Sequence, residues 1–374
     1  MAPARQRIAG LDGLRAIAVM MVFVDHRLPG ANGHFLGGYG VHIFFVLSGF
    51  LIVGGLHRDQ VAIARQRLSA LSAWTAFMTR RAARIFPAYF LLLAVLILLS
   101  LSGIGPYFEP GDALAHALFI TNIYFIETNH WGSFSQAWSL AIEEQFYLLS
   151  APLLLLIPPR ATWRVCLGVV LCGTFWNFWL SLFAARSMAP GLDSLSSFGL
   201  IALGGMLAVQ DRPSSSSLSA KIQVILLTGL SAIPFIPDGA SNPIIRQVAQ
   251  PLLAALLLAE IRDHQATWLV NALETKAIVY LGKISYGFYL IHQLVTPAFL
   301  RWTTGGCIDI TTWSPVEQIV PLLLISIGVA ACSWHWIEQP IIQRAKRWLT
   351  ISATLENSNL NDRFDVGDSV VSTR

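Results

Sequence analysis

The run GLRAIAVMMVFVDH, residues 13–26, is an apolar helix with charged residues near both ends. Arg15 lies near its start, and Asp25 and His26 lie at its end. An ionisable side chain inside an apolar span is costly and is therefore a candidate functional group. Arg15 and His26 share nearly the same helical face, about 16 Å apart along the axis. One face thus carries a cation near one end and an imidazole near the other.

Outside this run the composition is that of a membrane protein. Of the 374 residues, 55% are hydrophobic and 12% are charged, and the mean hydropathy is +0.59. Soluble domains have about 25% charged residues. A span needs about 20 apolar residues, and about ten such runs predict an all-α, polytopic transmembrane helix bundle. The runs cover residues 13–30, 37–56, 86–104, 134–157, 164–184, 194–210, 222–237, 245–261, 277–300 and 316–337.

Lys and Arg indicate the orientation of these spans. The connection 57–84 contains six arginines, whereas the connection 105–133 contains no basic residue. Basic loops stay on the cytoplasmic side, so we expect an even number of spans and both termini in the cytoplasm. The net charge of +4 is explained by this topology and does not indicate a nucleic-acid partner.

The chain divides into two parts. We expect a transmembrane domain over residues 1–345, with 57–84 as a cytoplasmic, basic amphipathic segment, and a polar, disordered cytoplasmic tail over 346–374. Residues 212–221 form a polar linker. The cysteines are scattered and indicate neither a disulfide framework nor a metal site: Cys166, Cys172, Cys307 and Cys332.

A pair of arginines stands at the entrance of the third span. Arg81 and Arg84 in RRAARIFPAYF, residues 80–90, are three positions apart and so share a helical face. They can be ordinary cytoplasmic anchors, as basic residues often are at span ends. They can also form a phosphate clamp, because guanidinium groups bind phosphate oxygens in a bidentate manner.

Two carboxylates lie in the apolar run QAWSLAIEEQFYLLSAP, residues 136–152. Glu143 has Ser139 four residues before it and Tyr147 four residues after it, on one helical face. Glu144 points elsewhere. The alternative to a functional role is that these side chains extend to the membrane interface.

Three further runs are less specific. The glycines of GGYGVHIFFVLSGFLIVGG, residues 37–55, favour close helix packing. In LGKISYGFYLIHQ, residues 281–293, His292 is a candidate for the outer half of a cavity, whereas an interfacial aromatic belt explains Tyr286 and Tyr289 equally well. WHWIEQPI, residues 334–341, is interpreted as the end of the last span.

Taken together, these motifs resemble the acyltransferase-3 family of bacterial integral-membrane O-acyltransferases. The resemblance covers nearly all of residues 8–342. The motifs occur in the family's order: LDGLRAIAV with His26, GGYGV, IFFVLSGFLI, RRAARIFPAY, WSLAIEEQFYL, ISYGFYLIHQ and IEQPI.

The resemblance implies a multi-pass enzyme of the bacterial cytoplasmic membrane that transfers acyl groups, most often acetyl, to sugar hydroxyls of surface glycans or lipid-linked saccharides. Acyl-CoA is the implied co-substrate, with no permanently bound cofactor and no metal. By position, His26 and Glu143 correspond to the family's catalytic groups, with Glu144 secondary, and Arg15, Arg81 and Arg84 to its arginines. Members usually have Asp where this chain has His42, which leaves that position without a role.

The expected mechanism places acyl-CoA phosphates on the arginines and the thioester near His26. His26 then removes the proton of a sugar hydroxyl or forms a covalent acyl-histidine. Glu143 is expected to orient or stabilise the imidazole, and Ser139 or Tyr147 to support the oxyanion. The acyl group can be acetyl, succinyl or larger. A transporter or flippase of lipid-linked saccharide, and a sensor without chemistry, are the alternatives.

Overall fold

A computed structural model of the chain describes residues 7–28, 36–103, 108–132, 134–184, 187–210, 248–307 and 309–351. Within these ranges the protein is all-helical and has no β-strand, which confirms the all-α part of the predicted fold class. The elements are α1 (Leu11–Arg27), α2 (Leu36–Ala64), α3 (Ala70–Leu101), α4 (Pro110–Ala117), α5 (Thr121–Thr128), α6 (Ala137–Leu156), η2 (Pro159–Ala161), α7 (Thr162–Phe183), α8 (Ala189–Leu192), α9 (Ser194–Val209), α12 (Gln250–Asp263), α13 (Trp268–Leu273), α14 (Lys276–Ile291), α15 (Pro297–Thr303), α16 (Pro315–Ser333) and the π-helical turn η5 (Trp334–Glu338).

Six helices of the described ranges are long and apolar enough to cross a membrane, as expected of a multi-pass membrane protein. The expected spans 13–30, 245–261 and 277–300 correspond to shorter helices, α1, α12 and α14, of 17, 14 and 16 residues. The expected span 222–237 and the linker 212–221 lie outside the described residues. A total of about ten spans and the cytoplasmic termini therefore stay predictions.

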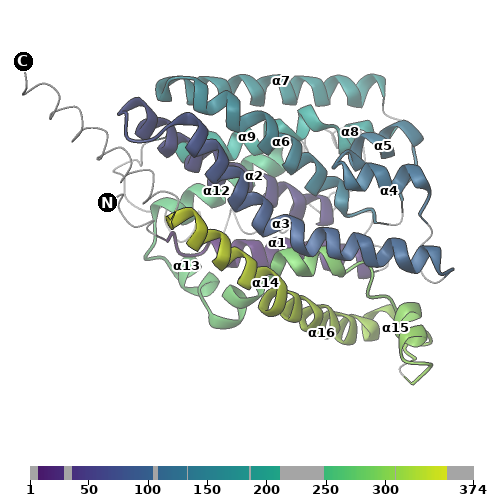
Figure 1. The fold of residues 1–374 in the computed structure, drawn as a ribbon. Helices are drawn as coiled ribbons and strands as arrows, with labels where there is room; N and C mark the ends of the chain where they lie inside the picture. Colours follow the sequence, from purple (N-terminus) through teal and green to yellow (C-terminus); the bar gives the residue numbers. More distant parts are fainter. Residues whose placement is uncertain are drawn as a thin grey trace, which may run out of the picture.

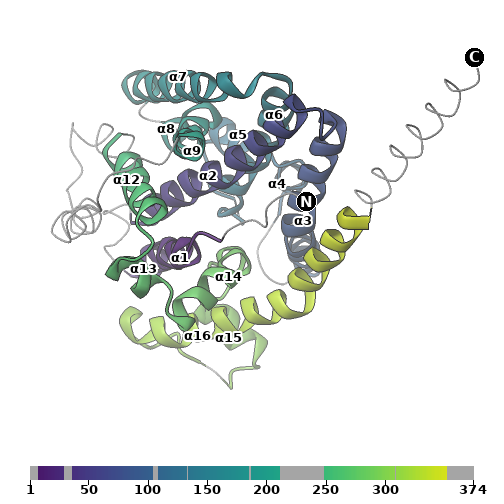
Figure 2. The ribbon, with the colours of Figure 1, turned by 90° about the vertical axis from the view of Figure 1, so that its left-hand side faces the viewer.

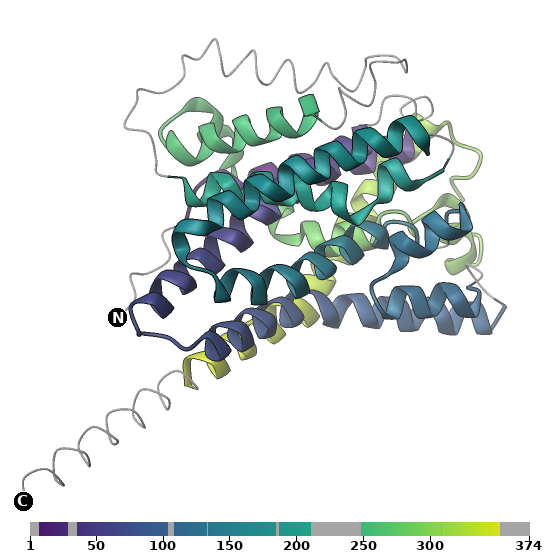
Figure 3. The ribbon, with the colours of Figure 1, turned by 90° about the horizontal axis from the view of Figure 1, so that it is seen from above.

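The long helices run side by side along the molecule (Figures 1 and 3). Helices α1, α2, α3, α6 and α14 surround the centre, and α7 and α16 lie near opposite edges (Figures 1 and 2). In α7 and α16 only 22% and 17% of the most apolar segment is buried, so most of their apolar surface is available to lipid. Helix α12 packs on the outside of α2 and α9.

Glycines bring the central helices unusually close together. A Cβ atom added at Gly49 of α2 would lie 1.7 Å from the carbonyl oxygen of Ile201, and one at Gly204 of α9 would lie 1.8 Å from that of Val46. The backbones of α2 and α9 are therefore in direct contact, as the glycine-rich run predicts. This contact fixes the part of α2 that contains Ser48.

The segment 57–84 is not a separate amphipathic helix. Helix α2 continues to Ala64 and ends near Gln66, which has a left-handed φ of 57°. Ser69 then caps α3 by accepting a hydrogen bond of 3.0 Å from the backbone N–H of Ser72. These two stop and start signals divide the segment between α2 and α3.

The run 334–341 is also not a helix end. The helix that begins at Pro315 continues through η5 to Ile351, so residues 346–351 of the expected tail are helical. Residues 352–374 lie outside the described part of the chain. A π-helical turn interrupts the 3.6-residue period of the apolar residues, and this interruption explains why the sequence of residues 334–341 resembles the end of a helix.

The expected outer connection 105–133 includes α4 and α5, which contain a buried histidine. His116 has no exposed surface and lies among aromatic rings, 5.3 Å from Phe134 and 5.6 Å from Phe108 between centroids. Its Nδ1 is 3.0 Å from Thr121 Oγ1. Burial lowers the pKa of His116 to about 4, so this side chain is neutral at physiological pH.

Candidate active site

A cavity lies between the five central helices α1, α2, α3, α6 and α14, and its volume is about 770 Å³ including the space that opens to solvent. One part of its wall is apolar and comes mainly from α2, including Phe44, Phe45 and Leu47. The polar lining residues are Arg15, Ser48, Arg81, Arg84, Ser139, Glu143, Tyr147, Ser285, Tyr286 and Tyr289.

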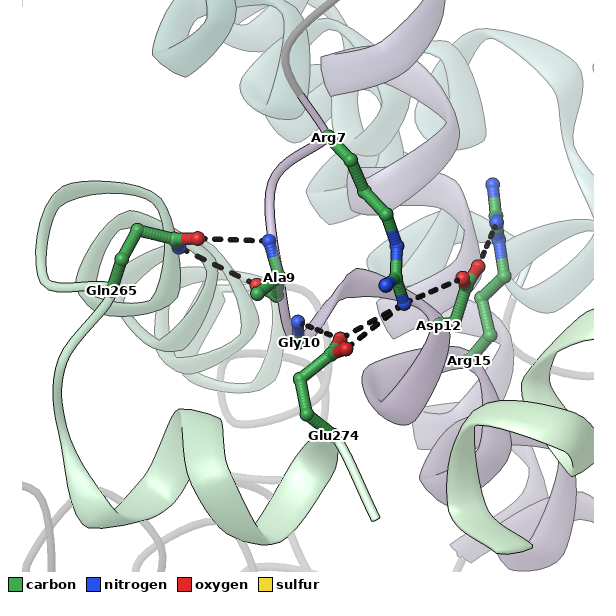
Figure 4. Close-up of polar contacts among 7 residues, drawn as sticks. All are labelled: Arg7, Ala9, Gly10, Asp12, Arg15, Gln265 and Glu274. Carbon is green, nitrogen blue, oxygen red and sulfur yellow. Dashed lines mark hydrogen bonds and ion pairs between the residues drawn. The ribbon is translucent and has the colours of Figure 1, made fainter. Parts of the chain in front are cut away.

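The three predicted arginines line this one cavity although they come from two helices. Arg15 is held by Asp12, with 3.1 Å between Nη1 and Oδ1 (Figure 4). The same figure shows the start of α1 fastened by Arg7 and by Glu274, which accepts a 2.6 Å hydrogen bond from the backbone N–H of Gly10. The N-terminal end of α1, which carries Arg15, is therefore fixed to Glu274, the residue that follows α13.

Arg81 and Arg84 approach the cavity from α3. The guanidinium carbon of Arg81 lies 5.6 Å from the ring centre of Tyr147 and 5.7 Å from that of Phe77, which are cation–π distances. The charges that act on Arg84 include Arg81 and the carboxylates Glu143 and Glu338. The residues that line the cavity include three arginines and one carboxylate, so the cavity favours an anion.

Glu143 is the carboxylate of the cavity, and its partner is Tyr147. Tyr147 Oη donates a hydrogen bond to Glu143 Oε2 and lies 3.1 Å from Ser48 Oγ. The four-residue spacing thus predicts this contact correctly. Glu144 is buried but does not line the cavity, as the helical phase predicts. We find no contact between Glu143 and His26 within the described residues, so the orienting role expected for Glu143 is not supported by the geometry.

Tyr286 and Tyr289 belong to the site rather than to an interfacial belt. Tyr289 Oη is 2.7 Å from Ser139 Oγ and donates a 3.1 Å hydrogen bond to the carbonyl of Gln136. Tyr286 Oη donates a 2.7 Å hydrogen bond to the carbonyl of Ile85 on α3. Both rings thus connect α14 to helices on the other sides of the cavity.

The two predicted histidines form a pair outside the cavity lining. His26 is exposed at the end of α1, and its Nδ1 lies 3.2 Å from Nε2 of the fully buried His292. Tyr289 is close to both the cavity and this pair: it lines the cavity, and its ring centre is 5.7 Å from that of His292. Neither His26 nor His292 is among the residues that line the cavity with the arginines. His42 does not line the cavity either.

Glu338 is a buried carboxylate near the site whose place the sequence pattern does not predict. Its exposed fraction is only 1%, Ser333 Oγ donates a 2.8 Å hydrogen bond to Oε1, and its charge acts on Arg84. An added Cβ at Gly287 would lie 2.8 Å from that oxygen, so the glycine of α14 makes room for the carboxylate. The only sequence signal is a carboxylate two positions before Pro340.

Comparisons with known proteins identify the family of the chain. A family profile described as an acyltransferase domain matches residues 8–335. The peptidoglycan O-acetyltransferase OatA of Listeria monocytogenes is 27% identical over 377 residues, which cover 90% of this chain and 56% of that protein. The O-acetyltransferase OatA of Staphylococcus aureus is 26% identical over 366 residues, with coverage of 89% and 57%.

The chain therefore spans little more than half the length of these curated relatives. No solved structure matches significantly. The resemblance carried by the sequence motifs is confirmed by the profile, whose match extends over well more than half of the residues. The chain belongs to the acyltransferase domain family.

Proposed function

We propose that this protein is an O-acetyltransferase of the bacterial cytoplasmic membrane, which moves an acyl group from cytoplasmic acyl-CoA to a sugar hydroxyl of an extracytoplasmic or lipid-linked glycan. The observation that carries the proposal is the convergence of Arg15, Arg81 and Arg84 on one cavity of a membrane-helix bundle. The named relatives favour acetyl as the acyl group and a glycan as the acceptor.

The arginines suit the anionic part of such a donor. Guanidinium groups bind phosphate oxygens with two parallel hydrogen bonds, and coenzyme A carries several phosphates. Tyr147 lies at cation–π distance from Arg81 and donates a hydrogen bond to Glu143, so we assign both residues to positioning the clamp. The apolar wall of α2 gives the pantetheine arm a surface along which to lie.

His26 is the group best suited to activate the acceptor. In the proposed reaction, its neutral imidazole takes the proton of the sugar hydroxyl, and the oxygen attacks the thioester carbonyl carbon. The carbon–sulfur bond breaks, and the CoA thiolate takes the proton back from His26. To reach His26, the acyl end of the donor passes Tyr289, whose hydroxyl and that of Ser139 are the nearest candidates to support the oxyanion.

The experiment is transfer of a labelled acetyl group from acetyl-CoA to glycan in membranes that contain the protein. His26→Gln should abolish transfer, because the glutamine amide cannot act as a base near neutral pH. Full transfer by this variant, at normal protein levels, would contradict the assignment of the base. A His57→Gln variant is the matched control, because His57 packs against Gln60 and Thr162 away from the cavity.

The alternative is a transporter or flippase of lipid-linked saccharide, which also needs polar residues inside spans. The purified protein in detergent separates the two functions. An acyltransferase consumes labelled acetyl-CoA and forms acylated acceptor, whereas a transporter leaves the donor intact. Donor consumption that requires both His26 and the arginine pair would exclude the transporter.

A further inference from the structure

His292 has a fixed tautomer in this structure. Its Nδ1 lies 2.8 Å from the carbonyl oxygen of Tyr289. A carbonyl oxygen only accepts hydrogen bonds, so Nδ1 of the neutral ring carries the proton. The lone pair of His292 is therefore on Nε2, which is the nitrogen that faces His26.

The same argument fixes the tautomer of His26. Its Nδ1 lies 2.9 Å from the carbonyl oxygen of Val22 and 3.2 Å from Nε2 of His292. Both neighbours are acceptors, so Nδ1 of His26 carries the proton and shares it between them. The lone pair of His26 is then on Nε2, the ring nitrogen without a hydrogen bond inside the described part of the chain, and the ring is exposed.

The surroundings hold His292 in this orientation. The ring is fully buried and parallel to that of Phe288, with 1° between the planes and 6.2 Å between the centroids. Arg27 of α1 donates hydrogen bonds to the carbonyls of His292 and Val295, the second at 2.8 Å. The end of α14 is thus tied to the same turn of α1 that presents His26.

We propose that His292 is a positioning residue for the general base: its Nε2 accepts the Nδ1 proton of His26, so that the lone pair of His26 faces the acceptor hydroxyl. This inference rests on the proposed function. When His26 takes the hydroxyl proton at Nε2, the ring becomes a cation and its Nδ1–H forms a charge-assisted hydrogen bond to His292. That bond is stronger in the transition state than in the resting enzyme, so it raises kcat rather than substrate binding.

The test compares His292→Phe with His292→Gln in the purified protein. Phenylalanine keeps the ring but removes the acceptor, whereas glutamine places an amide oxygen near the position of Nε2. We expect His292→Phe to lower kcat by roughly 10- to 100-fold, the worth of a hydrogen bond to a charged group, with an unchanged KM for acetyl-CoA. We expect His292→Gln to recover most of the rate. His335→Phe is the matched control, since this exposed histidine contacts Tyr280 instead.

Several outcomes separate this inference from the proposed function. An active His292→Phe beside an inactive His26→Gln would overturn the role of His292 and keep the base. A KM increase without a kcat decrease would also overturn it. If the wild type transfers no acyl group, the proposed function fails, and labelling of His26 by diethyl pyrocarbonate decides the tautomer argument. The unprotonated Nε2 of His26 should then react with this reagent about threefold more slowly in His292→Phe than in the wild type. Equal rates in the two proteins would refute the tautomer argument.

Discussion

The contact between α2 and α9 gives the sharpest test of the structure, through the substitution Gly49→Ala. The new Cβ would lie 1.7 Å from the carbonyl oxygen of Ile201, whereas ordinary contact begins at 3.4 Å. The obstructing atom belongs to the backbone of a packed helix and cannot rotate away. The two helices must therefore separate locally by more than 1 Å, roughly the size of the overlap.

The cost follows from this overlap. Overpacking typically costs 1–3 kcal/mol, and we expect about 3 kcal/mol here because no flexible side chain can yield. For a chain of this size, this corresponds to a decrease in unfolding temperature of roughly 4 °C. Transfer activity should also fall, because Ser48 next to Gly49 loses its 3.1 Å contact with Tyr147.

The assay is thermal unfolding in detergent, with Gly168→Ala on α7 as the control. Nothing lies within 4 Å of a Cβ atom added at Gly168, so this helix-interior change should be neutral or stabilise by about 0.5–1 kcal/mol. Gly204→Ala should destabilise like Gly49→Ala, and the double variant should cost less than the sum because one separation accommodates both methyl groups. A Gly49→Ala protein as stable as Gly168→Ala would refute the placement of α2 against α9.

Three further predictions concern single groups. The double variant Arg81→Ala with Arg84→Ala should raise the KM for acetyl-CoA by roughly 10- to 100-fold, measured in steady-state transfer, with little change for the acceptor; equal donor KM values would contradict the clamp. Tyr147→Phe should lower transfer by about tenfold, because it removes the hydrogen bond to Glu143 but keeps the ring near Arg81; unchanged transfer would contradict the positioning role. The unfolded state of the protein binds a proton on His116 at a higher pH than the folded state does, so stability should fall by about 2 kcal/mol from about pH 7 to about pH 5. Thermal unfolding at both pH values should show this loss of stability in the wild type and a smaller loss in His116→Phe. Equal losses in the two proteins would assign the acid sensitivity to another group.

Much of the site can be predicted from local sequence. Arg81 and Arg84 are three positions apart, and Glu143 and Tyr147 are four apart, so helical geometry alone places each pair on one face. The cost of a charge in an apolar run identifies Arg15 and Glu143 as candidates. Apolar runs of sufficient length likewise predict the all-helical fold.

What cannot be predicted depends on contacts between helices distant in the chain. The pairing of His26 with His292 joins α1 to α14, and neither helix alone indicates it. The role of Glu338 requires a turn that departs from the regular helical period. Tyr289 fits both an interfacial belt and a cavity wall by sequence, and only the packing of α14 against α6 distinguishes them.

The π-helical turn at Trp334–Glu338 means that residue number matters there as much as residue type. If its five residues took the regular 3.6-residue period, they would turn the chain further than the wider π-helical period does, and everything beyond them would rotate relative to the bundle. The carboxylate of Glu338 would then leave the space beside Gly287, although no side chain near it had been altered.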